Sequence, residues 1–139
     1  MEPRNYTTQE VANQLLKRKI NATSQRIEIA RVILSRCTHL SAEDVFTLVN
    51  NDQCQVSKAT VYNTLGLFAK KGLIREVIAD PNRIFYDPNT APHHHFYNVT
   101  TGELVDIDAS DMQVSGLPAL PEGTHMEGVD VIVRLRPTA

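Results

Sequence analysis

Apolar residues recur at helical spacing through the first half of the chain. A typical stretch begins with the capping signal Thr7-x-x-Glu10, and Val11 and Leu15 then fall on one face of the helix. Similar Ser or Thr signals precede three further amphipathic stretches, and the run from Asn50 to Gln53 has the polar composition of a turn. The pattern predicts four helices, within the ranges 7–19, 23–37, 41–49 and 57–72.

The fourth of these helices has two contrasting faces. Val61, Leu65 and Phe68 form the buried stripe, and Gly72 is well placed to end the helix. The opposite face mixes small polar, aromatic and cationic groups, which suit contact with phosphates and base edges in a DNA major groove. A plain solvated helix would show a similar face. The candidate DNA-contacting residues on this helix are Lys58, Thr60, Tyr62 and Asn63, and Arg26 in the second helix is added to them.

Strand-like runs replace the helical pattern after Gly72. The runs 73–78 and 83–87 flank the turn Asp80-Pro81-Asn82 and predict a β-hairpin. Helices followed by a hairpin are the order of a winged helix, in which the helix before the hairpin recognises DNA. The predicted fold class is therefore α+β, beginning with an N-terminal winged-helix domain at 1–87.

A second, smaller domain is predicted at 93–139, after a hinge at 88–92. Its strand runs are 93–99, 103–107 and 129–135, and the residues between the last two contain too many Gly and Pro for a long helix. About three strands make a thin sheet with little core of its own. We therefore expect a homodimer through this small α/β domain.

Candidate chemistry gathers around the run His93-His94-His95. In a strand His93 and His95 point to one face and His94 to the other, because side chains alternate. Asp87 lies at the end of the preceding strand run and Asp106 in the following one. Two imidazoles with a carboxylate from each neighbouring strand predict a pocket for a divalent metal ion.

Composition and charge add limits. The chain has 139 residues with a net charge of −2, yet residues 1–80 carry 11 Lys and Arg against 8 Asp and Glu. The remaining residues carry 3 against 8, and this asymmetry fits a DNA-binding module joined to a metal-binding one. No apolar run approaches a membrane span and the N-terminus has no signal-peptide pattern, so we expect a cytoplasmic protein. Cys37 and Cys54 are too few and too far apart for a zinc knuckle or a disulfide framework, and we interpret them as ordinary buried or reduced thiols.

Three segments together resemble the ferric uptake regulator (Fur) family: Leu40–Phe46, Ala59–Leu65 and His93–His95. The resemblance runs from about Thr8 to Leu135. It implies a winged-helix domain, a dimerisation domain and metal-controlled regulation of transcription. The expected partner is a palindromic operator in double-stranded DNA. A regulator of this kind, most simply a repressor of iron or peroxide-stress genes, is not an enzyme.

The resemblance also implies a ligand set and a signal. The regulatory metal site of the family maps onto His39, Asp87, His93, His95 and Asp106. This set is similar to that of the peroxide-sensing (PerR) branch, in which bound ferrous iron promotes oxidation of the histidines. The heme-associated iron response regulator (Irr) branch also fits, and it leaves His94 as a heme or outer-shell group. The donors suit Fe(II) or Mn(II), and Zn(II) in vitro.

Two departures from the family pattern matter. Most members carry a CxxC motif that holds structural zinc, but Asn98 and Thr101 stand at those positions, so we expect no structural zinc there. The 108–128 segment is also short of the helix usual in the dimerisation domain. A metalloenzyme or a metal-storage module remains the competing class, although the sequence contains no HExxH, no GxSxG and no Gly-rich phosphate loop.

Overall fold

The computed structural model describes residues 4–36, 38–51 and 55–138. The chain divides into two compact units, Met1–Thr90 and Ala91–Ala139. The expectations for Cys37 and Cys54, and for the end of the predicted turn at Gln53, lie outside the described residues.

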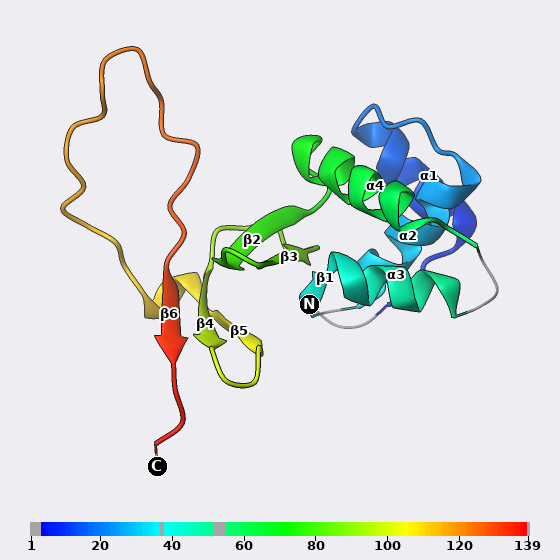
Figure 1. Cartoon of the computed structure of the whole chain (residues 1–139). Helices are drawn as coiled ribbons and strands as arrows, with labels where there is room; N and C mark the ends of the chain where they lie inside the picture. Colours follow the sequence, from blue (N-terminus) through cyan, green and yellow to red (C-terminus); the bar gives the residue numbers. More distant parts are fainter. Residues whose placement is uncertain (1–3, 37, 52–54, 139) are drawn as a thin grey trace. The chain divides into compact units, whose positions relative to one another are not determined.

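The first unit contains the four predicted helices, gathered together in Figure 1. Each begins at a Ser or Thr whose side-chain oxygen accepts the backbone N–H three residues later, which satisfies one of the free donors of the first turn. At Ser41 the cap is reciprocal with Asp44, whereas the carboxylate of Glu10 contacts Arg4 instead of completing the box at Thr7. The helices are α1 (Thr8–Lys17), α2 (Ser24–Leu34), α3 (Ala42–Asn50) and α4 (Lys58–Lys70).

The apolar faces of these helices form one core. Leu15, Ile29, Val45 and Phe68 are each fully buried in it. At the end of α4, Gly72 has a φ of +79°, and the backbone N–H groups of residues 72 and 73 return to the carbonyls of Ala69 and Phe68. This glycine cap ends α4 as predicted and sends the chain into the hairpin.

A three-stranded sheet completes the first unit. β2 (Arg75–Asp80) and β3 (Arg83–Asp87) form the predicted antiparallel hairpin. β1 (Leu40–Ser41) pairs with the other edge of β3, which gives the order β1-β3-β2. β1 was not predicted, because two residues are too short to show an alternating pattern. The helices followed by this hairpin form the winged-helix arrangement.

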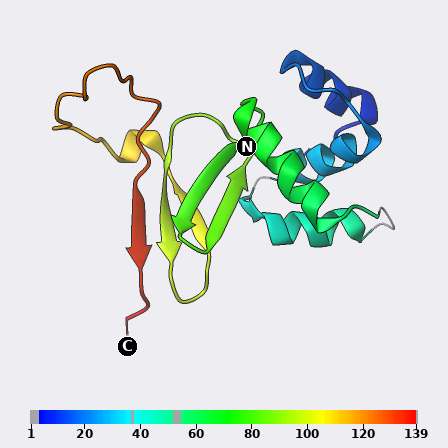
Figure 2. The ribbon, with the colours of Figure 1, turned by 45° about the horizontal axis from the view of Figure 1, so that its top comes forward.

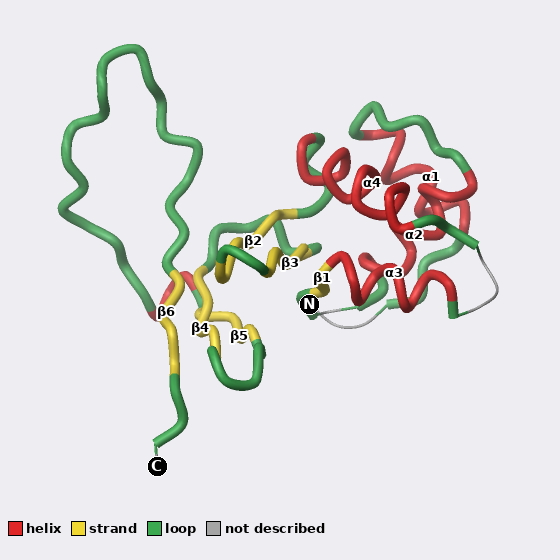
Figure 3. Tube along the Cα trace, viewed as in Figure 1, coloured by secondary structure: helices red, strands yellow, loops and turns green. Residues whose placement is uncertain are grey.

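The second unit is a separate three-stranded sheet. β4 (His94–Asn98) is its central strand, with β5 (Leu104–Ile107) antiparallel on one side and β6 (Ile132–Leu135) parallel on the other. Residues 108–131 connect β5 to β6 and contain one short 3₁₀ helix, η1 (Ala109–Asp111). Figure 3 shows this connection as a long loop. Within the described residues 108–128 there is no long helix, as the glycines and prolines predicted.

No helix in the described part of the chain is long and apolar enough to cross a membrane.

Neighbouring leucines in α1 provide a test of the helical core. Leu15 is fully buried, whereas the side chain of Leu16 is 58% exposed. We expect Leu15→Ala to lower the free energy of unfolding by about 2–5 kcal/mol, because it removes buried contacts and leaves a cavity. Leu16→Ala should change it by less than about 0.5 kcal/mol. Urea unfolding followed by circular dichroism measures both, and equal losses would contradict the assigned faces of α1.

Candidate metal centre

In the first unit, two predicted metal ligands face each other. His39 immediately precedes β1, and the β1–β3 register continues outward from Leu40 opposite Tyr86 to bring His39 opposite Asp87. Nε2 of His39 lies 3.1 Å from Oδ2 of Asp87, and both side chains are largely buried, with 8% and 6% exposed. The other carboxylate oxygen of Asp87 accepts the backbone N–H of Asn89 at 2.9 Å, which fixes the direction of Oδ2. The short strand β1 is therefore what positions His39.

In the second unit, the other three predicted ligands converge. His95 and Asp106 are direct cross-strand partners on β4 and β5, and His93 lies one residue before β4 on the same face. Nε2 of His95 lies 3.2 Å from Oδ1 of Asp106, and Nε2 of His93 lies 3.4 Å from that same oxygen. The two imidazole rings are 4.6 Å apart at their centroids. Both histidines are buried, while about half of the Asp106 side chain is exposed.

A backbone contact fixes the tautomer of His93. Its Nδ1 lies 2.6 Å from the carbonyl oxygen of Ala91, and a carbonyl oxygen can only accept, so Nδ1 carries the hydrogen. In a neutral ring Nε2 then presents a lone pair toward the Asp106 carboxylate. Two acceptors that face each other at this distance repel unless a cation lies between them. A metal-binding histidine typically has its second nitrogen held in this way.

The third histidine of the run has a different contact. Nδ1 of His94 accepts the backbone N–H of Val131 at 3.0 Å, so this side chain ties β4 to the residue before β6. His94 is only half-buried and belongs to the opposite face of the strand from His93 and His95. Its predicted heme or outer-shell role stays a prediction.

The predicted DNA-contacting residues on α4 differ in their exposure. Lys58, Tyr62 and Asn63 are exposed. Thr60 is half-buried, and its hydroxyl oxygen accepts from the Ser57 hydroxyl at 2.9 Å. Arg26, in α2, is half-buried and donates to the carbonyl oxygen of Asn21 at 2.9 Å.

An acidic partner on this surface was not predicted from the sequence. Nζ of Lys58 lies 2.6 Å from a carboxylate oxygen of Glu43, in the first turn of α3. The hydrogen bond from Lys58 to Glu43, and then the negative charge of Glu43, raise the pKa of Lys58 above its ordinary value. Both side chains are more than half exposed, so water and ions screen the pair and a DNA phosphate can replace the carboxylate.

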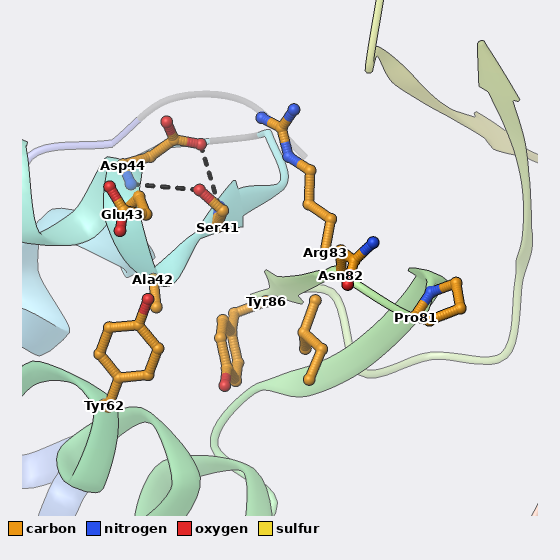
Figure 4. A pocket seen from close by; sticks show the side chains of 10 residues that line it. Ser41, Ala42, Glu43, Asp44, Tyr62, Pro81, Asn82, Arg83 and Tyr86 are labelled. Atoms are coloured by element: carbon orange, nitrogen blue, oxygen red, sulfur yellow. Dashed lines mark hydrogen bonds between the residues drawn. The ribbon is translucent and has the colours of Figure 1, made fainter. Parts of the chain in front are cut away.

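A pocket of about 350 Å³ lies between the beginning of α3 and the β2–β3 hairpin, which is the wing of the winged helix (Figure 4). Tyr62 from α4 and Tyr86 from β3 project toward it, and Arg83 stands at the wing side. Burial is the main cause that raises the pKa of Tyr86, so this phenol stays neutral at ordinary pH. The pocket belongs to the same surface as the exposed residues of α4. Its lining residues are Ser41, Ala42, Glu43, Asp44, Tyr62, Pro81, Asn82, Arg83, Ile84 and Tyr86.

A winged helix joined to a small sheet domain with histidine and aspartate donors defines the class: a metal-dependent DNA-binding regulator. The chain matches the model of the Ferric uptake regulator family over residues 17–132. It belongs to this family, whose members are metal-dependent regulators of transcription in iron and peroxide responses and not enzymes.

Relatives and solved structures agree with this assignment. The chain is 30% identical to a peroxide-responsive repressor PerR of Staphylococcus aureus over 112 residues, which is 81% of this chain and 73% of the relative. It is 31% identical to the ferric uptake regulation protein of Synechococcus elongatus over 126 residues, or 87% and 86% of the two chains. The structure of the ferric uptake regulator of Pseudomonas aeruginosa with manganese has the same fold, with a TM-score of 0.71 and 22% sequence identity. The match covers 91% of this chain and 97% of that one. Other solved structures with this fold hold iron or zinc.

The ion pair on α3 and α4 gives a direct prediction. Glu43→Gln should lower the pKa of Lys58 toward the ordinary lysine value, because the substitution removes the negative charge that stabilises the ammonium group. An NMR pH titration of the lysine side chains measures this. Glu28→Gln is the matched control, since Glu28 pairs with Arg31 and not with Lys58. An unchanged Lys58 pKa in Glu43→Gln would contradict the pair.

Proposed function

We propose that this chain is a homodimeric operator-binding repressor, and that His39, Asp87, His93, His95 and Asp106 together hold one regulatory metal ion. The single observation that carries the proposal is the convergence of His93 and His95 on one carboxylate oxygen of Asp106 while Nδ1 of His93 is fixed on Ala91. The family membership supports the regulatory role.

The donor chemistry fits a divalent transition metal. Neither His39 with Asp87 nor the three donors of the second unit supply a full coordination shell alone. Together they supply imidazole nitrogens and carboxylate oxygens without sulfur, which suits Fe(II), Mn(II) or, in vitro, Zn(II). Mn(II) is supported by the manganese-containing relative of the same fold. When bound, the ion would supply positive charge that stabilises both carboxylates and the buried imidazoles.

Ligands from both units make such an ion a conformational effector. Two donors come from Met1–Thr90 and three from Ala91–Ala139, with the predicted hinge 88–92 between the functional domains 1–87 and 93–139. An ion that needs all of them binds most tightly when the units adopt one arrangement. By thermodynamic linkage, metal then favours the DNA-competent arrangement, and DNA raises metal affinity by the same factor.

The DNA partner is proposed to be a palindromic operator. A two-fold dimer presents two recognition helices, so its half-sites are related by the same symmetry. Exposed Lys58, Tyr62 and Asn63 on α4 supply phosphate and base contacts, with Thr60 and Arg26 as further candidates. Such a protein acts where its operator lies, in the cytoplasm.

The signal that releases DNA is proposed to be peroxide acting through the metal site, as the peroxide-responsive relative suggests. Buried imidazoles next to a ferrous ion are suitable targets for oxidation, and loss of one ligand would weaken the selected arrangement. Heme sensing through His94 is the alternative hypothesis. Two measurements separate them: an absorption spectrum of the protein with Fe(II) or heme, and mass analysis of peptides that contain His39 and His93 after peroxide treatment of the Fe(II)-loaded protein. An oxygen adduct supports peroxide sensing, and a Soret band without an adduct supports heme.

The metal ligands can be tested with matched histidine variants. His93→Ala should weaken Mn(II) binding by about a hundredfold or more, because one direct ligand is removed. His39→Ala should do the same, and both should abolish metal-dependent binding to the operator while circular dichroism stays unchanged. His125→Ala is the control, since His125 is exposed and outside the donor group. Fluorescence anisotropy with labelled operator, with and without Mn(II), measures the response. A His39→Ala protein that still responds to metal with unchanged affinity would exclude a role for this residue.

The recognition helix can be tested with salt dependence. Lys58→Ala should weaken binding to every DNA sequence and reduce the slope of log K against log salt by about 0.9 for each phosphate that the protein no longer neutralises. Tyr62→Ala should cost about 1–3 kcal/mol on the operator and much less on unrelated DNA, because it removes an interaction with the bases. Lys17→Ala, at the end of α1, serves as a charge-matched control. Normal operator binding by Tyr62→Ala would show that α4 is not the recognition helix.

A further inference from the structure

The connection between β5 and β6 leaves one face of the second sheet without cover. β5 ends beside His94 and β6 begins beside His95, so the connection only has to pass one end of β4 and need not cross a face of the sheet. This connection contains only η1 and then continues as irregular chain. Figures 1 and 2 show residues 112–131 leaving the strands as a long open loop and returning to β6. We name residues 113–128 of this loop the arm.

The uncovered face is apolar. Phe96 on β4 is a cross-strand partner of Val105 on β5 and is aligned with Val133 on β6, so these three side chains share a face. It is the face opposite to His95 and Asp106. Phe96 is 37% exposed, Val105 is 47% exposed and Leu135, at the end of β6, is 40% exposed. We name Phe96, Val105, Val133 and Leu135 the apolar face.

The arm has apolar side chains that do not pack on its own sheet. Every residue from 113 to 128 is exposed, and Leu117, Leu120 and Met126 each show more than half of their surface. Among these described residues, the hydrogen bonds run only from Thr124 back to the carbonyl oxygen of Pro121. The arm therefore has neither an apolar partner nor a backbone partner on the strands that it connects.

We propose that the arm of one copy lies across the apolar face of a second copy, and that the second copy does the same in return. Each chain carries one uncovered apolar face and one arm with unburied leucines, so a two-fold exchange satisfies both. Exposed apolar surface of this kind marks a site of association. The inference rests on the proposed homodimer, and it names the segment that covers the exposed face of the sheet.

The charges favour a second copy over an unrelated partner. The charged residues of the arm are Glu122 and Glu127, both exposed. The Lys and Arg residues of the second unit are Arg134 and Arg136, both exposed. Arg134 is aligned with Tyr97 and belongs to the His95 face, whereas Arg136 follows Leu135 just beyond the end of β6. An arm that reaches the partner sheet brings acidic groups toward Arg136 at the end of β6, which adds a preferred direction to the apolar contact.

Sedimentation equilibrium on the full chain tests the exchange. We expect the double substitution L117D/L120D to raise the dimer dissociation constant at least tenfold, because two charges would enter the apolar contact. S115D is the control: it adds a charge to the same arm without removing an apolar side chain, and its dissociation constant should stay within twofold of wild type. A dimer of unchanged affinity in L117D/L120D would overturn the arm exchange and leave the proposed regulator intact.

Cross-linking identifies the chain on which the arm lies. In a background with Cys37→Ser and Cys54→Ser, one tagged copy carries V105C and a differently tagged copy carries L117C. A short bismaleimide should join the two tags after mixing. A further chain that carries both V105C and L117C reports contact within one copy. Cross-links within that chain but none between the two tagged copies, or no cross-links at all, would overturn the proposal. A wild-type protein that is monomeric at all concentrations would overturn both the exchange and the proposed homodimer. A wild-type protein that is dimeric but does not bind operator DNA would contradict the proposed operator binding and leave the exchange intact.

Discussion

The apposition of acceptor atoms around Asp106 is the constraint from which the proposed metal site follows. The Ala91 carbonyl fixes the hydrogen of His93 on Nδ1, so Nε2 of the neutral ring presents its lone pair to Oδ1 of Asp106 at 3.4 Å. His95 reaches the same oxygen at 3.2 Å. A nitrogen lone pair and a carboxylate oxygen at this distance are stabilised by a cation between them, and a buried nitrogen has little water with which to compensate. The sheet register builds this arrangement, because His95 and Asp106 are direct partners on β4 and β5.

The same logic explains how a metal ion can control DNA binding. The winged-helix unit brings His39 to Asp87 through the short pairing of β1 with β3, and it also carries the exposed face of α4. The sheet unit carries the other donors. A ligand shared by two units changes the population of their arrangements only through its different affinity for each arrangement. The proposed ligand set gives the ion that differential affinity, because an incomplete set of donors binds a cation less tightly.

Local signals in the sequence predicted most of the fold. The Ser and Thr caps, the apolar stripes and Gly72 marked the four helices, and strand-like runs between turn residues marked β2 to β6. The strand β1 escaped because two residues carry no period, although this strand sets the position of His39. The alternation rule also separated His94 from His93 and His95. The contact between Glu43 and Lys58, the hydrogen bond from Val131 to His94 and the uncovered sheet face depend on distant residues, which local patterns do not record.

In the proposed site, one metal ion takes its ligands from both units. X-ray absorption spectroscopy of the Mn(II)-loaded wild-type protein, with the metal content of the same sample, tests this directly. We expect one ion per chain in a nitrogen and oxygen shell, with imidazole scattering from His39, His93 and His95 together. Imidazole scattering that stays the same in His39→Ala, or a shell that contains sulfur, would contradict the shared site.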